Sequence, residues 1–343
     1  MSPVLKACGR GTSSPYGSVV VLLLITAPAR ALTPFVEQLR KAESRDASDP
    51  ERVEFATRAL RAWMPSDGRP LLAHAHFARA EGEAALFDDA AAEEDLTKAL
   101  EIDERNDRAR LMRSRARAAL GRGAEAERDA VEYLEARPDD AEGWLALGEA
   151  RLASGAPKAD RPARGAFAKA ASLLGAEDPR PSLGEGRAHL AARRHPEALA
   201  SLSAAAERPQ KRRAEILTWR SRAYSALGDW EAARGDLSRA IPDLERVLDE
   251  RRRAGTVKRG VDAARKTLAD AYFRRGLACE ALKAKTEALA DHHQACGRGQ
   301  PPACARVAAR EKPAPKAPPA PKPKKAPRRK NPKGNSGDRI YAN

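Results

Sequence analysis

Two side chains with metal-binding chemistry stand one helical turn apart near the C-terminal end of the chain. His292 and Cys296 are four residues apart, so both would lie on one helix face, and His293 is adjacent. A closed zinc site needs four such ligands, but neither a pair of acidic residues nor a CxxC motif is nearby. His74 and His76 would point their rings to different helix faces. The sequence therefore predicts no metal site.

The sequence also lacks the short motifs that carry common catalytic mechanisms. It contains no phosphate-binding glycine-rich loop, no HExxH, no G-x-S-x-G and no nucleophile with a fitting His/Asp context. Phe, Trp and Tyr make up only 4% of the residues, too few for platforms on which nucleic-acid bases stack. We therefore predict that the chain is not an enzyme, needs no cofactor and has no dedicated nucleic-acid partner.

A degenerate repeat of about 34 residues runs from Ala73 to about Gln300. Its landmark is a small residue followed four positions later by a large one and seven positions later by alanine, with some variation. The six sets are Ala92/Leu96/Ala99, Ala126/Ala130/Tyr133, Ala163/Phe167/Ala170, Ala198/Leu202/Ala205, Ala233/Leu237/Ala240 and Ala288/His292/Ala295. Because one helical repeat cannot bury its apolar face, neighbouring units must stack on a shared core.

A second small residue stands eight positions into each unit. The six are Ala80, Ser114, Gly148, Gly186, Ser221 and Gly276. We expect the two helices of each hairpin to cross closely there, because a larger side chain would push them apart. Gly121 and Gly228 are expected to end first helices, since glycine suits the left-handed cap.

Together these positions resemble the tetratricopeptide repeat (TPR) family. The resemblance implies an all-α fold, an α-solenoid of stacked helix-turn-helix repeats with a disordered C-terminal tail. Arg110, His76 and Ser182 depart from the family, because an aromatic residue is usual there. The third unit carries an insertion around residues 156–161, and an Arg-rich stretch, 249–264, separates the fifth unit from the sixth. The alternative is an ordinary Ala-rich helical bundle with accidental periodicity.

The repeats define four segments of the chain. Residues 73–308 form the array of six units with a C-terminal capping helix, and residues 309–343 form the tail. Residues 32–72 are expected to form an N-terminal helical hairpin that caps the array. A helix start is expected there at Asp49, which would cap the helix. Pro50 suits the first helical position, and the acid Glu51 suits the positive end of the helix dipole. Residues 1–31 form the leader.

The leader has the features of a cleavable export signal. Lys6 and Arg10 precede an apolar run at residues 19–25, and Ala29 and Ala31 mark an A-x-A cleavage site. The run is far shorter than the roughly 20 residues that span a bilayer. We expect a mature chain without a transmembrane span, exported to the periplasm or secreted. The alternative is a buried helix or a frayed terminus.

Three cysteines remain after the leader. Cys296 lies at the end of a second helix and Cys304 just inside the next, across a Gly/Pro turn that allows them to approach. The spacing resembles the disulfide-stapled hairpins of Sel1-like repeat proteins, which implies a Cys296–Cys304 bond and fits an oxidising compartment. The alternative is two free thiols. Cys279 occupies a buried position of the sixth unit and is expected to be an inert, small apolar residue.

The tail carries most of the net charge. Residues 310–343 contain eleven Lys or Arg and two acidic residues, and the whole chain has a formal charge of +15. Lys, Pro and Ala dominate the segment, which therefore cannot form a packed core and is expected to be disordered. Because export argues against nucleic acid, the tail would contact polyanions of the cell envelope, or act as a solvated spacer.

The TPR resemblance also suggests where a ligand would bind. In the family the first helices line the inner groove, and particular positions of each unit face it. Read onto this chain, one of those positions holds Arg115, Arg187 and Arg222 in three units and Glu81, Glu149 and Leu277 in the other three. A second position adds Arg108 and Arg180, which gives five arginines in all. Such a row would suit carboxylates through bidentate pairing. The alternative is chance placement in an Arg-rich chain.

Two functional hypotheses follow from these features. In the first, the chain is a non-catalytic exported scaffold that binds an acidic protein or peptide in its concave groove. In the second, it is a cell-envelope tether whose basic tail binds a polyanionic surface, with the array as a spacer.

Overall fold

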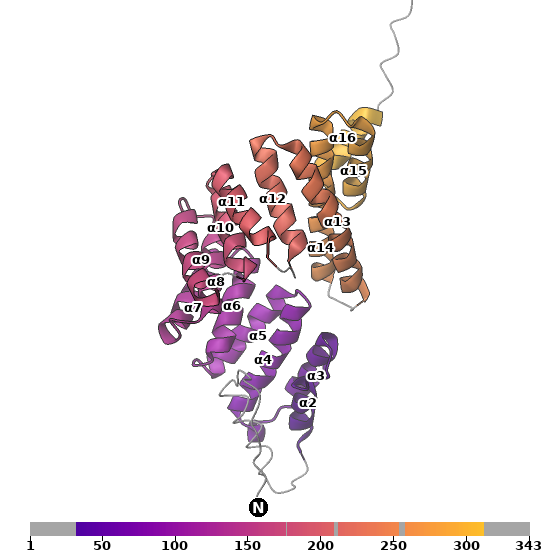
Figure 1. Cartoon of the computed structure of the whole chain (residues 1–343). Coiled ribbons are helices and arrows are strands. Elements are labelled where there is room, and N and C mark those ends of the chain that lie inside the picture. Colours follow the sequence, from indigo (N-terminus) through magenta and orange to yellow (C-terminus); the bar gives the residue numbers. More distant parts are fainter. Residues whose placement is uncertain (1–31, 176, 209–211, 254–257, 312–343) are drawn as a thin grey trace, which may run out of the picture.

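All regular elements in the described part of the chain are helical. The structure is a computed structural model, and it describes residues 32–175, 177–208, 212–253 and 258–311. The leader and its cleavage site, and all of the tail beyond residue 311, lie outside these ranges. Helices pair into hairpins that stack side by side into a curved superhelix (Figure 1). The predicted all-α solenoid is thereby confirmed.

The helices alternate between first and second members of each hairpin. The N-terminal hairpin consists of α2 (Pro34–Ala42) and α3 (Asp49–Ala62), followed by a short 3-10 turn (Pro65–Asp67). The first helices of the six units are α4 (Arg69–Ala85), α6 (Asp107–Ala119), α8 (Ala141–Ala153), α10 (Pro179–Ala191), α12 (Arg213–Leu227) and α14 (Lys258–Ala281). The second helices are α5 (Asp89–Ile102), α7 (Gly123–Ala136), α9 (Asp160–Leu174), α11 (His195–Ala206), α13 (Trp230–Arg253) and α15 (Lys285–Gly297). The last helix is α16 (Pro301–Glu311).

Capping residues begin several first helices. Asn106 caps α6 by accepting from the N–H of Ala109 at 3.0 Å, and Asp178 caps α10 by accepting from the N–H of Arg180 at 2.9 Å. These side chains satisfy donors that a helix start leaves open, so they set where each unit begins. Gly121 and Gly228 have φ of +78° and +82° at the ends of first helices, as predicted.

The repeat landmarks form the core of the array. All eighteen landmark residues are buried, with exposed fractions of 0–4%. The small residue of a first helix faces the large residue of its own second helix. A Cβ atom added to Gly148, Gly186 or Gly276 would lie 2.5–2.6 Å from the side chain of Phe167, Leu202 or His292, respectively. The predicted close crossing is therefore confirmed at these three glycines.

The stretch between the fifth and sixth units differs from the expectation. Residues 249–253 still belong to α13, and residues 258–264 already belong to α14. The buried side chains of Leu248, Ala264 and Leu268 hold these two helical extensions together. The described parts of the stretch thus lengthen the fifth second helix and the sixth first helix.

The C-terminal end of the array is stapled. Cys296 and Cys304 form a disulfide with a Cα–Cα distance of 4.7 Å, whereas Cys279 is free and buried, as predicted. The tail was expected to start at residue 309, but α16 continues to Glu311. Arg306 and Arg310 of this last helix pair with Glu280 of α14, which holds the helix end on the array.

Candidate partner-binding groove

First helices lie on the inner, concave side of the superhelix. The first helices α6, α8, α10 and α12 contact one another in succession, in addition to their own second helices. Helices nearer the axis of a curved stack must be closer together than those outside it, so direct contact places the first helices inside. The surface available to a partner in the groove is therefore made by α4, α6, α8, α10, α12 and α14.

The first two predicted groove arginines both pair with a neighbouring unit. Arg108 of α6 donates from Nη2 to Glu81 of α4 at 2.5 Å. Arg115, two turns further along α6, donates to Glu142 of α8, also at 2.5 Å. Each pair joins the first helices of adjacent units. The side chains of Arg108 and Arg115 remain 63% and 46% exposed, so solvent screens both pairs.

The arginines of α10 continue this pattern in the middle of the array. Arg180 donates from Nη1 to Glu142 at 2.8 Å, so Glu142 bridges α6 and α10. Arg187 donates from Nη1 to Glu149 of α8 at 2.6 Å. Hydrogen bonds to Asp178 and Glu142 raise the pKa of Arg180 against the effect of burial, so this side chain stays cationic.

Arg222 of α12 lies against an aromatic ring. Its Cζ atom is 4.1 Å from the ring centroid of Trp219 on the same helix, and that of Arg187 is 5.3 Å from the same ring. Arg222 also donates to Asp270 of α14 at 2.8 Å, and Asp270 accepts a second bond from Arg274 at 2.7 Å. Burial and the nearby Arg274 lower the pKa of Arg222. Arg187 and Arg222 thus share the indole ring of Trp219, and Arg222 and Arg274 share the carboxylate of Asp270.

The five arginines thus all lie on first helices, and each is paired with at least one carboxylate. We call this row of ion pairs the ladder. Their partners are Glu81, Glu142, Asp178, Glu149 and Asp270. A guanidinium carries five N–H donors, so pairing with one carboxylate leaves donors for a second anion. The ladder can therefore stabilise the curvature of the array and also bind a carboxylate that reaches the groove.

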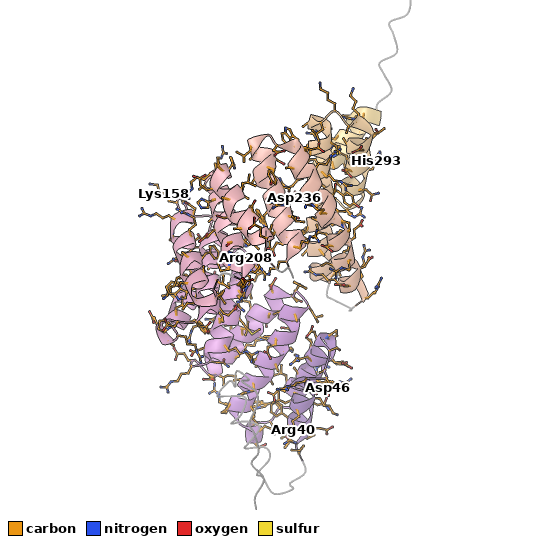
Figure 2. The ribbon with its side chains drawn as sticks, in the orientation of Figure 1. Arg40, Asp46, Lys158, Arg208, Asp236 and His293 are labelled. Atoms are coloured by element: carbon orange, nitrogen blue, oxygen red, sulfur yellow. A yellow bond between two sulfur atoms is a disulfide. The ribbon has the colours of Figure 1, made fainter. Side chains whose placement is uncertain are left out.

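A second set of ion pairs holds four of the six repeat hairpins from within, and the sequence reasoning missed it. Four bidentate pairs repeat at a separation of sixteen residues: Arg79–Asp95, Arg113–Asp129, Arg220–Asp236 and Arg275–Asp291. The four aspartates are no more than 4% exposed, and Asp236 is labelled in Figure 2. The signal was available, because each arginine precedes the small landmark and each aspartate precedes the large one.

The histidines and Cys296 are placed apart from any metal-like cluster. Cys296 is in the disulfide, and the buried ring of His292 lies with Nε2 3.3 Å from Glu280. His76 contacts Asp95 at 3.0 Å, whereas His74 lies 3.8 Å from Glu43. Within the described ranges, no group of three or more His, Cys, Asp or Glu residues is arranged to hold a metal ion.

Cys279 lies beside a hollow in the surface, but its surroundings do not activate the thiol. The hollow, of about 470 Å³, is formed by α13, α14 and α15. The Cys279 thiol lies 3.8 Å from the Glu287 carboxylate, and burial together with nearby Asp291 and Glu287 raises its pKa to about 11. A thiol with such a pKa is protonated at neutral pH, so it is a poor nucleophile.

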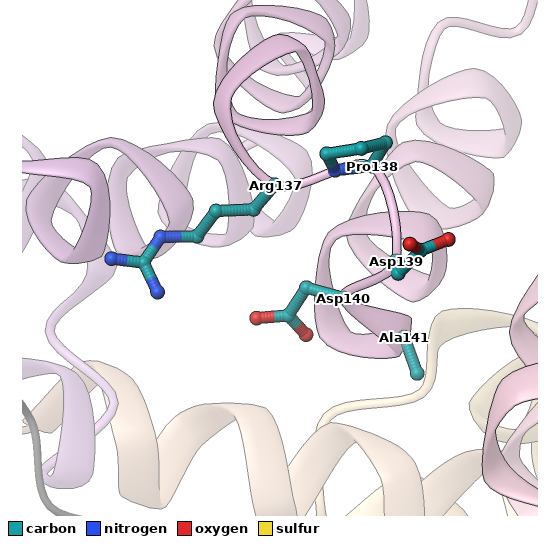
Figure 3. A pocket seen from close by; sticks show the side chains of 5 residues that line it. All are labelled: Arg137, Pro138, Asp139, Asp140 and Ala141. Carbon is teal, nitrogen blue, oxygen red and sulfur yellow. The ribbon is translucent and has the colours of Figure 1, made fainter.

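A hollow of about 410 Å³ lies at the linker between α7 and α8, lined by residues 137–141 (Figure 3). Its polar side chains have structural roles. Arg137 donates to Asp107 at 3.0 Å, and Asp140 accepts from the hydroxyl of Tyr133 at 2.5 Å. These contacts fix the turn between the second and third units, and we assign the hollow no ligand.

These features define a class of protein: an α-solenoid of helical hairpins with an inner face of paired charges. No protein-family model matches the sequence, and comparison with curated proteins gives no match. The fold is that of tetratricopeptide repeat proteins. A TPR protein from Parabacteroides merdae superposes with a TM-score of 0.54 and 18% identity, over 80% of this chain and 98% of that one. TTC0263, a thermophilic TPR protein of Thermus thermophilus, gives a TM-score of 0.47 and 19% identity, over 53% and 97%. No helix in the described ranges is long and apolar enough to cross a membrane.

Proposed function

We propose that this protein is an exported, non-catalytic scaffold that binds an acidic segment of a partner protein in its concave groove. The TPR fold supports a role in protein interaction, because stacked helical repeats provide an extended concave binding surface. The expectation that the partner segment is acidic rests on the cluster of Arg187, Trp219 and Arg222 on α10 and α12. An aromatic ring in contact with two guanidinium groups offers a partner both an apolar surface and charge-assisted hydrogen-bond donors.

A binding measurement with a defined probe tests this proposal. A fluorescently labelled Glu-rich peptide should bind the full chain, and binding should weaken with salt because exposed charges are screened. Arg222→Gln should weaken binding about tenfold or more, since a charge-assisted contact contributes about 1.5–3 kcal/mol. Arg128→Gln, on the exposed side of second helix α7, makes the same charge change away from the groove.

The control decides what the result means. The Arg128→Gln variant should bind the peptide as the unmodified protein does. Equal weakening by both variants would indicate a general charge effect and contradict a groove site. Circular dichroism of Arg222→Gln must show an intact array, because Arg222 also pairs with Asp270.

Export is part of the same proposal. It is supported by the leader pattern of residues 1–31 and by the Cys296–Cys304 disulfide, since such bonds persist in oxidising compartments. Localisation in the periplasm or outside the cell is tested by fractionation of cells that express the full chain.

The second candidate, a tether to the cell envelope, rests on the charge of the tail. Eleven Lys or Arg residues against two acidic residues at positions 310–343 favour binding to a polyanionic surface. A pull-down from envelope extracts, with the full chain and with a chain truncated after residue 311, separates the two functions. Capture of a protein partner should survive truncation if the groove binds it, and should be lost if the tail is the binding segment.

A further inference from the structure

The α13–α14 hairpin is longer than the other hairpins of the array. Each of its two helices has 24 residues, whereas the other helices of the repeats have 12 to 17. Residues 244–253 and 258–268 project beyond the repeat core, and we call these two helical extensions the arm. Leu248 and Leu268 are buried between its helices. The arm is therefore a packed continuation of the array.

The arm reaches back to the first unit. Near the end of α13, the guanidinium carbon of Arg251 lies 3.4 Å from the ring centroid of Phe87. Nη1 of Arg251 also donates to the carbonyl of Gly260 at 2.9 Å, which ties this side chain to α14. Phe87 lies in the turn between α4 and α5, and Figure 1 shows the end of the arm beside that turn. The contact thus joins two ends of the superhelix that are far apart in sequence.

Phe87 is unfavourable within its own hairpin. Its φ is +61°, in the left-handed region, where a side chain crowds the following carbonyl oxygen. The same turn holds Gly121 and Gly228 in the second and fifth units, without such crowding, whereas Arg193 and Lys283 take φ of +56° and +61° there in the fourth and sixth units. Phe87 differs from these residues because its side chain is large and apolar, yet 42% exposed. Its ring is in contact with the guanidinium of Arg251.

The charges of the two surfaces are complementary. The first unit, residues 73–106, contains ten acidic residues and three Lys or Arg, and Asp88 and Asp89 directly follow Phe87. Residues 243–268 contain eight Lys or Arg and five acidic residues. Burial and the neighbouring Asp88 raise the pKa of Asp89, as expected for acids gathered at one turn. The first unit is thus acidic in sequence and the arm basic, and the Arg251–Phe87 contact brings the two together.

We propose that the arm is a latch that closes the superhelix onto its first unit, with Phe87 as the docking point for Arg251. The latch restricts access to the concave side from the opening between the first and sixth units. Breaking the Arg251–Phe87 contact opens this side and lets the arm helices open locally more often, while the repeat cores stay folded.

Hydrogen–deuterium exchange of the full chain without a partner tests the latch independently of the proposed binding function. Phe87→Gly removes the ring and introduces the residue that already stands at Gly121 and Gly228, so the hairpin should fold. Arg251→Ala removes the other half of the contact. Each variant should accelerate amide exchange in residues 244–253 and 258–268 about two- to fivefold, the factor expected for a partly exposed cation–π contact. Because Arg251→Ala also removes the hydrogen bond to the Gly260 carbonyl, the double variant should exchange no faster than Arg251→Ala alone.

Arg253→Ala is the matched control, because it removes the same charge two residues away, at an exposed position. It should leave exchange in the arm unchanged. Unchanged exchange in Phe87→Gly would overturn the latch, and so would equal acceleration in the control or additive effects in the double variant. Small-angle scattering of Phe87→Gly should show a larger radius of gyration, and an unchanged radius would likewise contradict opening.

Discussion

Gly148 provides the sharpest test of how the hairpins are packed. It lies in α8, and a Cβ atom at this position would be 2.5, 2.6 and 2.8 Å from three ring carbons of Phe167. The ring cannot move away from α8, because α10 packs against it as well. A Cβ atom added to Gly184 of α10 would be 2.5 Å from the same ring. Phe167 is fully buried between the two glycines. Gly148→Ala should therefore force the helices apart.

The expected magnitude follows from two opposing effects. Alanine in place of glycine inside a helix stabilises by about 1 kcal/mol through helix propensity. Overpacking a closed crossing costs about 1–3 kcal/mol. Gly165→Ala is the control, because Gly165 lies inside α9 with nothing within 4 Å of an added Cβ atom, so it has the propensity gain without the clash. The two variants should differ in stability by about 1–3 kcal/mol.

Urea denaturation followed by circular dichroism measures this difference. Gly165→Ala should unfold at a higher urea concentration than the unmodified protein, and Gly148→Ala at a lower concentration than Gly165→Ala. Gly148→Leu should be less stable still. Phe167→Leu should recover part of the loss in the Gly148→Ala background, because it removes the ring that clashes. Equal midpoints for the two alanine variants would refute the close crossing and the repeat phase derived from it.

Three further predictions concern other parts of the molecule. Asp236→Ala should destabilise the array by about 3–5 kcal/mol, because it removes a buried carboxylate and leaves the partly buried guanidinium of Arg220 without its partner. Burial lowers the pKa of His292 from its ordinary 6.5, so the folded chain binds fewer protons there than the unfolded chain. Stability should therefore fall as pH drops below about 6.5, and His292→Leu should reduce this loss in melting curves at pH 5 and 7.5. Cleavage after Ala31 should give a mature chain that begins at Leu32 in N-terminal sequencing.

Each of these has a result that would contradict it. Replacing both members of the Arg220–Asp236 pair by apolar residues should be less harmful than Asp236→Ala, and the reverse order would argue against an uncompensated charge. An identical acid-induced loss in His292→Leu would show that other groups cause it. An intact Met1 on the cytosolic protein would exclude the proposed export.

The repeat phase could be read from the sequence because its signals are local. Small residues at helix crossings and the spacing of the large and small landmarks depend only on helical geometry. The structure buries every landmark, from Ala92 in the first unit to Ala295 in the last. The disulfide was equally accessible, since Cys296 and Cys304 are separated only by a turn.

The charge network could be foreseen only in part. Five groove arginines were expected from the repeat positions, but most of their acidic partners come from neighbouring units, at separations of 27, 38 and 48 residues. Which carboxylate each arginine reaches depends on the stacking distance and the twist between units. Both quantities follow from the packing of the whole array. The arginines that the sequence suggested as a cationic row are therefore ion-paired in the structure.

The arm shows most clearly what tertiary structure decided. Sequence alone determined that residues 249–264 depart from the repeat, but the helical state of residues 249–253 and 258–264 depends on the packing of α13 against α14. The approach of Arg251 to Phe87 depends further on the accumulated curvature of all the intervening hairpins. A small rotation per unit, summed along a solenoid, sets where its ends meet, and no local pattern of residues encodes that sum.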